Sequence, residues 1–309
     1  MKNQFNSCNK RLVLVLALIS ISYINAQREP QYTQYINNTL TYNPAYISTQ
    51  EEITITALGR SQWAGFEGAP KTLSFSAILP SLKRFGTGLN IIHDEIGATK
   101  QTSISANLAY EIQVNKSIYT SFGISAGGSF LNINYNDGNQ LHANDPLLVN
   151  TNYFDPNLGF GIMTYADNWY AGLSVPNFLK SKYYSEKKSS LIASENLQYF
   201  ILGGYIFNIN DHLKFKPAVL ARVSKNLPLV IDYSANVLIN KKVTVGISYR
   251  SSEIVTGIFG IQLTDIFYLG YSYDRTFSNL NRYNKGSSEI LLKITIPRKI
   301  KTIQSPRFY

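Results

Sequence analysis

The sequence has almost no cysteine, few charges and no long apolar run, and each shortage excludes a class of protein. Its one cysteine, Cys8, lies near the start of the 309 residues, so the rest of the chain offers neither a disulfide framework nor thiolate chemistry. The longest apolar run, 12–24, is interrupted by Ser20 and Ser22 and is shorter than the ~20 residues that a membrane-spanning helix needs. We therefore exclude helical membrane spans.

Charge is also scarce, and what remains is mostly positive. Charged residues make up 16% of the chain, against roughly 25% in ordinary soluble proteins. The net charge is +10, but no nucleic-acid-binding motif accompanies it, so an anionic lipid or a protein partner fits better than nucleic acid. Aromatic residues are abundant, with 22 tyrosines, which suits a protein that meets a water–lipid boundary on two rims.

The apolar run 12–24 has the pattern of a secretory signal peptide. Two lysines and an arginine precede it, and the small residue Ala26 closes it. The alternative, a buried N-terminal helix, would make both flanks coincidental. We expect cleavage after Ala26 and export of a mature chain that begins at Gln27, with the outer membrane as its destination.

The stretch 229–250, LVIDYSANVLINKKVTVGISYR, shows the unit from which the chain is built. Apolar side chains occupy every second position through 229–239 and again through 243–249, and most of the residues between them are polar or glycine. A period of two places the apolar residues on one face of an extended strand. The polar residues 240–242 separate the two runs, which predicts a β-hairpin.

The same alternation recurs from 53 to 296 and predicts about fourteen strands, with twelve and sixteen as alternatives. The predicted strands are 53–60, 71–79, 85–93, 101–112, 117–132, 156–164, 169–175, 194–207, 213–223, 229–239, 243–250, 254–263, 266–274 and 287–296. Glycines within them suit the bends of a curved sheet. They are Gly86, Gly88, Gly127, Gly128, Gly159, Gly161, Gly203 and Gly204.

The connections alternate in length along the chain. Every second one is short: 80–84, 113–116, 165–168, 208–212, 240–242 and 264–265. The other set contains all the long connections: 61–70, 94–100, 133–155, 176–193 and 275–286. Outer-membrane barrels have short periplasmic turns and longer loops at the other end, whereas a soluble sandwich has no reason to sort its loops in this way. Since an open sheet edge is costly in hydrocarbon, we predict an all-β, closed, antiparallel transmembrane barrel over 53–297.

Two segments of the chain lie outside the predicted strands. The segment 27–52 is polar and aromatic, without clean alternation, and we expect it to be either periplasmic or a plug. The segment 298–309 is a basic tail, which we expect on the periplasmic side.

No residues form a convincing catalytic, cofactor-binding or metal-ligating pattern, so we expect no enzyme activity and no cofactor. Histidine, the usual general base, occurs only three times. His93 adjoins Asp94 and Glu95, but adjacent residues of a strand point to opposite faces. His142 and His212 fall in polar connections, where solvated loop residues are the better interpretation.

The connection 60–71 differs from the others in its residues. It sets Trp63 and Phe66 among glycines at a predicted strand rim, with Arg60 and Glu67 nearby. Such aromatic side chains either anchor a barrel at the lipid headgroups or contribute to partner binding. Both interpretations remain open from the residues alone.

Several motifs together resemble the PorP/SprF family of type IX secretion system membrane proteins of Bacteroidetes. They are PQYTQY (30–35), NPAY (43–46), RSQWAGFEGAPKT (60–72), HDEIGATKQT (93–102), PNLGFGIMTYADNWYAGLSVPNF (156–178) and GYSYDRTFSNL (270–280). The resemblance extends over essentially the whole mature chain.

This resemblance implies an outer-membrane component of the type IX machinery. Such a protein either anchors periplasmic parts of the machinery or delivers and holds a cargo adhesin at the cell surface, in some members with a link to gliding motility. The implied partners are periplasmic secretion proteins, the C-terminal domain of a secreted cargo or adhesin, and outer-membrane lipid. From another class, an outer-membrane channel or transporter for small solutes is the alternative. The residues that we expect to bind a partner are Arg60, Gln62, Trp63, Phe66, Glu67, Asp94 and Ile96.

Overall fold

A computed structural model describes residues 31–82, 84–134, 151–179, 197–225, 227–277 and 285–297. The expected signal peptide 1–26, the basic tail 298–309 and His142 lie outside the described residues. Within the described part, no helix has the length and apolar character needed to cross a membrane.

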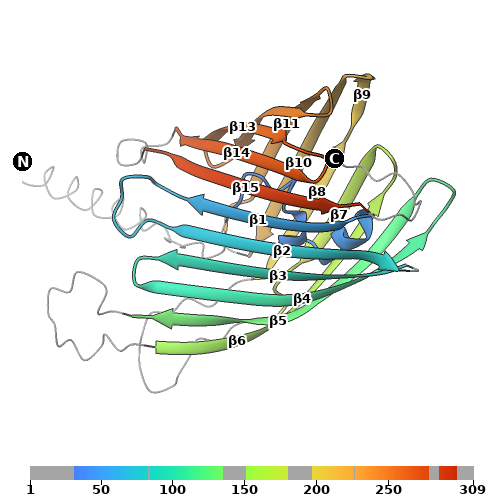
Figure 1. Cartoon of the computed structure of the whole chain (residues 1–309). Coiled ribbons are helices and arrows are strands. Elements are labelled where there is room, and N and C mark those ends of the chain that lie inside the picture. The colour runs from blue at the N-terminus through green and yellow to red at the C-terminus, as the bar shows by residue number, and fades with distance from the viewer. Residues whose placement is uncertain are drawn as a thin grey trace, which may run out of the picture.

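Antiparallel strands make up almost all of the described chain (Figure 1). The strands are β1 (Ile53–Ser61), β2 (Lys71–Leu82), β3 (Phe85–Ile96), β4 (Thr99–Gln113), β5 (Tyr119–Ile133), β6 (Thr151–Tyr165), β7 (Trp169–Val175), β8 (Gln198–Tyr205), β9 (Phe207–Asn210), β10 (Leu213–Ser224), β11 (Val230–Ile239), β12 (Val243–Arg250), β13 (Ile254–Gln262), β14 (Phe267–Thr276) and β15 (Ser287–Ile296).

The strands close into a barrel. Apart from β8 and β9, consecutive strands pair with each other, and β1 pairs with β15 in a register that sets Ile53 opposite Ile296. β8 and β9 both pair with β10 and form one wall strand interrupted at Ile206, so the ring has fourteen strands. The fold class and the strand number predicted from the alternation are therefore confirmed.

The two faces of the wall are those that the alternation predicts. On the β11–β12 hairpin, Tyr233 and Ile247 are 51% and 57% exposed on the outside, whereas Asp232 and Ser248 are 1% and 3% exposed on the inside. Because the outer face is apolar over most of the ring, it is suited to the hydrocarbon of a bilayer.

The connections differ between the two ends of the barrel. The end with the β1–β2 connection, residues 62–70, is called the long-loop end; the end with the β11–β12 turn, residues 240–242, is called the short-turn end.

The prediction of a long connection at 94–100 is wrong. β3 and β4 continue to a pairing of Ile96 with Thr99, which leaves a two-residue turn in which Gly97 has a φ of +55°. The apolar alternation stops at His93 because the outer face turns polar there, although the backbone pairing continues.

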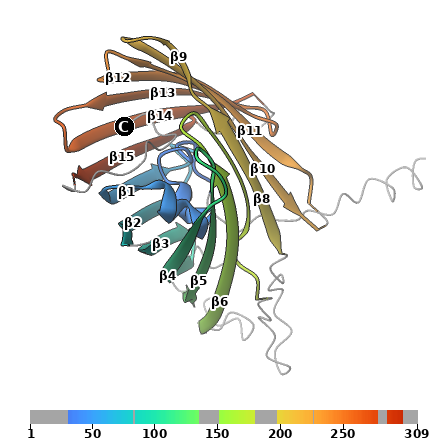
Figure 2. The same ribbon diagram turned by 90° about the vertical axis from the view of Figure 1, so that its right-hand side faces the viewer.

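The segment before β1 lies inside the ring. Residues 31–50, which we call the plug, contain two short 3-10 helices, η1 (Thr39–Thr41) and η2 (Pro44–Thr49). Figure 2 shows this segment, in blue, surrounded by the strands. At the start of η2 the Asn43 side chain accepts a hydrogen bond from the Ala45 N–H at 2.9 Å, and Pro44 supplies the φ that a first helical position favours.

The outward face gives a direct test of where the bilayer lies. Ile247 lies in the middle of β12 and Leu263 follows β13 at the short-turn end, and both are 57% exposed. We expect Ile247→Lys to lower the free energy of unfolding by about 2–4 kcal/mol and Leu263→Lys by about 0–1 kcal/mol, since a cation costs most at the bilayer midplane. Denaturant unfolding of the protein folded into lipid vesicles measures both. Equal losses would contradict this placement.

Candidate functional site: a filled lumen and the loops at one end

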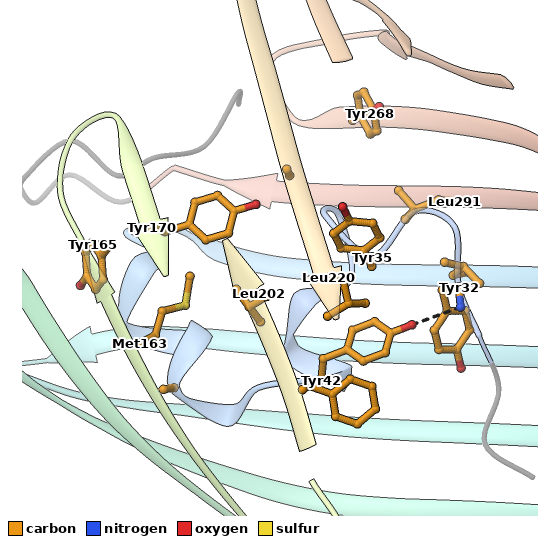
Figure 3. Close-up of a cluster of buried hydrophobic side chains, with 14 of the residues drawn as sticks. Tyr32, Tyr35, Tyr42, Met163, Tyr165, Tyr170, Leu202, Leu220, Tyr268 and Leu291 are labelled. Carbon is orange, nitrogen blue, oxygen red and sulfur yellow. Dashed lines mark hydrogen bonds between the residues drawn. The ribbon is translucent and has the colours of Figure 1, made fainter. Parts of the chain in front are cut away.

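Aromatic side chains of the plug fill the middle of the barrel. Tyr32, Tyr35 and Tyr42 are buried against side chains that point inward from strands around the ring, including Met163 and Leu220 (Figure 3). The Tyr42 hydroxyl accepts a hydrogen bond from the Tyr32 N–H at 3.1 Å. Burial raises the pKa of Tyr42 to about 12, so its phenol stays neutral at ordinary pH.

The plug is bonded to strands on several sides of the ring. Four hydrogen bonds show the spread: Asn38 Nδ2 to Ser74 Oγ of β2 at 3.2 Å, Ser121 Oγ of β5 to Ser48 Oγ at 2.8 Å, Ser174 Oγ of β7 to the Tyr42 carbonyl at 2.7 Å, and Tyr35 with Ser234 of β11 at 2.9 Å. A segment held in this way is an integral part of the barrel interior.

Glycines of β5 and β6 make room for the plug. A Cβ atom at Gly161 would collide with Asn43 Oδ1, and one at Gly123 would collide with the Ala45 backbone. The Asn43 amide also donates to the Ile162 carbonyl at 3.1 Å. The sequence interpretation assigned Gly161 to sheet curvature. In the structure, Gly161 lies where the plug approaches the wall closely, and a side chain would not fit there.

A buried cluster of charges, called the Arg60 cluster, holds the first residues of the plug near the long-loop end. Arg60 of β1 forms ion pairs with Asp274 of β14 at 2.6 Å and with Glu289 of β15 at 3.0 Å. Glu289 accepts hydrogen bonds from the N–H groups of Thr33 and Gln34 at 3.1 and 2.8 Å. The Thr33 hydroxyl donates to Asp274 at 2.8 Å. One guanidinium faces two carboxylates here. Further donors to these carboxylates come from the plug and from the Thr256 hydroxyl of β13, which donates to Asp274 at 2.8 Å.

A second buried cluster has two guanidiniums and one carboxylate. Asp232 of β11 pairs with Arg250 of β12 at 2.5 Å and with Arg222 of β10 at 3.3 Å. Taken together, the two clusters hold three guanidiniums and three carboxylates. Charges inside a membrane protein are tolerated when they are paired in this way.

A modest cavity lies beside the plug in the described part of the lumen. It has a volume of about 110 Å³ and lies between the plug and the inner faces of β3 to β6. Amide and hydroxyl side chains line much of it, including Asn90, Asn107 and Asn157. A space of this size holds a few waters, whereas small-molecule sites usually occupy roughly 300–1,000 Å³.

The β1–β2 connection forms an ordered rim at the long-loop end. Its Ala64 N–H donates to the Gly286 carbonyl at 2.9 Å, and the Gly97 N–H of the β3–β4 turn donates to the Gly68 carbonyl at 3.0 Å. The loop and the β3–β4 turn enclose a hollow of about 360 Å³. Trp63 has a φ of +47°, a conformation that a bulky residue rarely adopts.

The residues expected to bind a partner divide into two groups. Arg60 and Asp94 point into the barrel and are buried; Asp94 accepts a hydrogen bond from Thr72 Oγ1 at 2.5 Å. The remaining residues are exposed or half-buried at the rim. They are Trp63 (40% exposed), Phe66 (59%), Ile96 (40%), the exposed Glu67 and the half-buried Gln62.

The group around His93 is divided between the two faces. Asp94 points inward, as strand geometry requires, but Glu95 shares the outer face with His93 and lies 3.3 Å from it. His93 also contacts Thr102 Oγ1 at 2.8 Å. In the described part of the chain, no three histidine, cysteine or acidic side chains converge to hold a metal ion.

Sequence reasoning missed the plug contacts of Asp274 and Glu289. A usable signal was present, because both residues occupy polar, inward positions of predicted membrane strands. An acidic residue there needs a partner, and Arg60 occupies an equivalent position on β1, opposite Glu289 in the β1–β15 register.

Comparison with known proteins gives one family and one fold. A family model described as type IX secretion system membrane protein PorP/SprF matches residues 24–294. Among curated protein sequences none matches the chain.

Solved structures share the barrel at low sequence identity. The toluene transporter TbuX of Ralstonia pickettii has a TM-score of 0.50 at 9% identity, over 84% of this chain and 93% of that one. The toluene transporter TodX of Pseudomonas putida has a TM-score of 0.48 at 10% identity, over 85% and 95% of the two chains. A FadL homologue of Pseudomonas aeruginosa has a TM-score of 0.46 at 10% identity, over 83% and 93%. Identity this low shows a shared fold alone.

The Arg60 cluster predicts how the plug is held. We expect Glu289→Ala to lower the free energy of unfolding by about 3–5 kcal/mol, because it leaves a buried guanidinium short of a partner. It also releases the N–H groups of Thr33 and Gln34, whose hydrogen exchange should accelerate. The control Glu67→Ala removes an exposed carboxylate at the same end and should change stability by less than about 0.5 kcal/mol. Unchanged exchange at Thr33 and Gln34 would show that Glu289 does not hold the plug.

Proposed function

The chain belongs to the PorP/SprF family of type IX secretion system membrane proteins, and on that premise we propose that it holds an exported adhesin at the cell surface and docks on the secretion assembly at the periplasmic side. It is an outer-membrane barrel with a role in type IX secretion. The family and the fold are those of a secretion-system membrane protein, and we propose a non-enzymatic role.

The filled lumen is the observation that carries this proposal. A protein that works by conduction needs a continuous aqueous path, whereas this barrel has polar and aromatic plug residues bonded to its inner wall. The plug is bonded to the wall along its length, from Thr33 near the long-loop end to Ser48 beside β5, and these bonds make the wall more rigid. A rigid, filled barrel supports a role as a membrane platform for protein partners.

The two ends of the barrel support two different contacts. With the short turns in the periplasm, the usual orientation of such barrels, the long-loop end faces outward. There Trp63 and Phe66 present exposed aromatic surface on a loop whose backbone is fixed by its neighbours. Exposed aromatic residues on a rigid support are the usual centres of binding energy in protein interfaces. The short-turn end, where β15 ends at Ile296, would meet the periplasmic machinery.

The rim aromatics allow a test of adhesin holding. We expect the double variant Trp63→Ala, Phe66→Ala to fold, to reach the outer membrane at the normal level, and to release the exported adhesin into the medium. Removing one buried aromatic anchor typically costs about 2 kcal/mol or more of binding free energy. Phe85→Ala, which removes an exposed aromatic side chain at the short-turn end, is the matched control. Loss of the barrel from the membrane would instead assign Trp63 and Phe66 to lipid anchoring.

A solute channel is the competing function, and conductance separates the two. We expect the purified wild-type protein to show no large, steady current in planar bilayers, because the plug occupies the lumen. A variant with several plug bonds removed together, Asn38→Ala, Tyr42→Ala and Asn43→Ala, should show frequent openings of larger size. A steady open-channel current in the wild-type protein would overturn the platform proposal in favour of conduction.

A further inference from the structure

Three charged side chains form a row on the outer face of β2, β3 and β4 at the long-loop end. In the strand register Lys71 of β2 lies opposite Glu95 of β3, and Glu95 lies opposite Lys100 of β4. Lys100 Nζ is 3.5 Å from Glu95 Oε1, and His93 Nε2 is 3.3 Å from the same oxygen. We call Lys71, Glu95 and Lys100 the charged row. One carboxylate stands between two lysines in it, so the row carries a net positive charge.

The charged row lies where the apolar outer face ends. Leu73, Phe75 and Ile104 point outward on the same strands, nearer the middle of the barrel, and are 63%, 39% and 41% exposed. Lys71 comes two residues before Leu73, which places it about 5 Å nearer the long-loop end when a strand rise of about 3.3 Å per residue and a tilt of about 40° are combined. The headgroup layer of a bilayer is roughly 5–8 Å thick on each side. The charged row is therefore level with lipid headgroups.

The hollow at the rim adjoins the charged row. Lys71 lines it together with the β1–β2 connection, and its volume of about 360 Å³ falls within the roughly 300–1,000 Å³ usual for small-molecule sites. Glu67 of that connection also lines the hollow. The Lys285 side chain lies beside Gly65, where a Cβ atom would be 3.8 Å from its Cδ. Together with the charged row, three lysines and two carboxylates lie in or beside the hollow, so its surroundings are positive.

The charges decide which headgroup suits this place. Lysine is a common ligand of phosphate groups, and its flexible side chain lets two lysines approach one anion. Lys71 and Lys100 are two strands apart, about 9–10 Å between their backbones, so one phosphate fits between their ammonium groups. Glu95 stands between them and repels an anion, which limits the affinity without removing the net attraction. A headgroup without phosphate would gain little from these lysines.

We propose that Lys71 and Lys100, with the hollow beside them, bind the phosphate-bearing headgroup of an outer-leaflet lipid. The acyl chains of this lipid lie along Leu73 and Ile104, on the outer face between the charged row and the middle of the barrel. Its headgroup enters the hollow and contacts the β1–β2 connection from the membrane side. The choice of leaflet follows from the outward orientation of the long-loop end, whereas lipid binding itself does not depend on adhesin holding.

Native mass spectrometry of the detergent-solubilised full chain, titrated with bisphosphorylated lipid A, measures this contact. We expect the double variant Lys71→Gln, Lys100→Gln to bind the lipid about tenfold more weakly than the wild-type protein, because two attractions to the headgroup are lost. The matched control Lys241→Gln, Lys242→Gln removes two exposed lysines from the β11–β12 turn at the opposite end, and its affinity should stay within about twofold of wild type. Equal losses in the two double variants, or equal binding of lipid A stripped of its phosphates by the wild-type protein, would overturn the proposal.

A change at Glu95 gives a result of opposite sign. Glu95→Gln removes the one negative charge of the row, and we expect it to bind bisphosphorylated lipid A about threefold more tightly than the wild-type protein does. Weaker binding by this variant would contradict the proposal. Inorganic phosphate at the concentration of the lipid should not displace it, and displacement would assign the row to free phosphate instead. If Lys71→Gln, Lys100→Gln binds the lipid normally but releases the exported adhesin from cells, the row contacts protein and the lipid proposal fails.

Discussion

In a bilayer every backbone N–H and C=O must find a partner within the protein, and this requirement explains most of the structure. It accounts for the pairing of the first strand with the last, because only a closed ring leaves no edge. It also explains why wall residues alternate so regularly between apolar and polar.

A second requirement acts in two buried clusters, where guanidiniums and carboxylates are paired. The Arg60 cluster has an excess of carboxylate and the Asp232 cluster an excess of guanidinium, and both lie in the same lumen. Plug backbone donors complete the first cluster, so a segment without acidic or basic side chains becomes part of the electrostatic arrangement. Removing one partner from such a buried pair is strongly destabilising, because the other charge is left without compensation.

Local alternation was enough to predict the barrel, its faces, the strand number and, with the motifs, the family and the outer-membrane location, all of which are confirmed. Alternation is a local property and survives wherever one face meets lipid. It failed at 94–100, where pairing continues above the apolar belt without an apolar pattern. It put Arg60 and Glu289 at inward positions but did not pair them, and it gave no sign that Gly161 lies under Asn43. Those contacts join residues far apart in the chain, and no local pattern encodes them.

The contact between Thr33 and Glu289 has a consequence for the order of assembly. These residues come from the two ends of the chain, 256 positions apart, and the same β15 that supplies Glu289 also closes the ring against β1. Contacts of such long range form late and slowly in folding. The first residues of the plug therefore gain these contacts only when the last strand pairs with β1, which links the filling of the lumen to the closure of the wall. A barrel halted before β15 pairs with β1 would expose both an unpaired strand and a guanidinium that lacks one of its carboxylates.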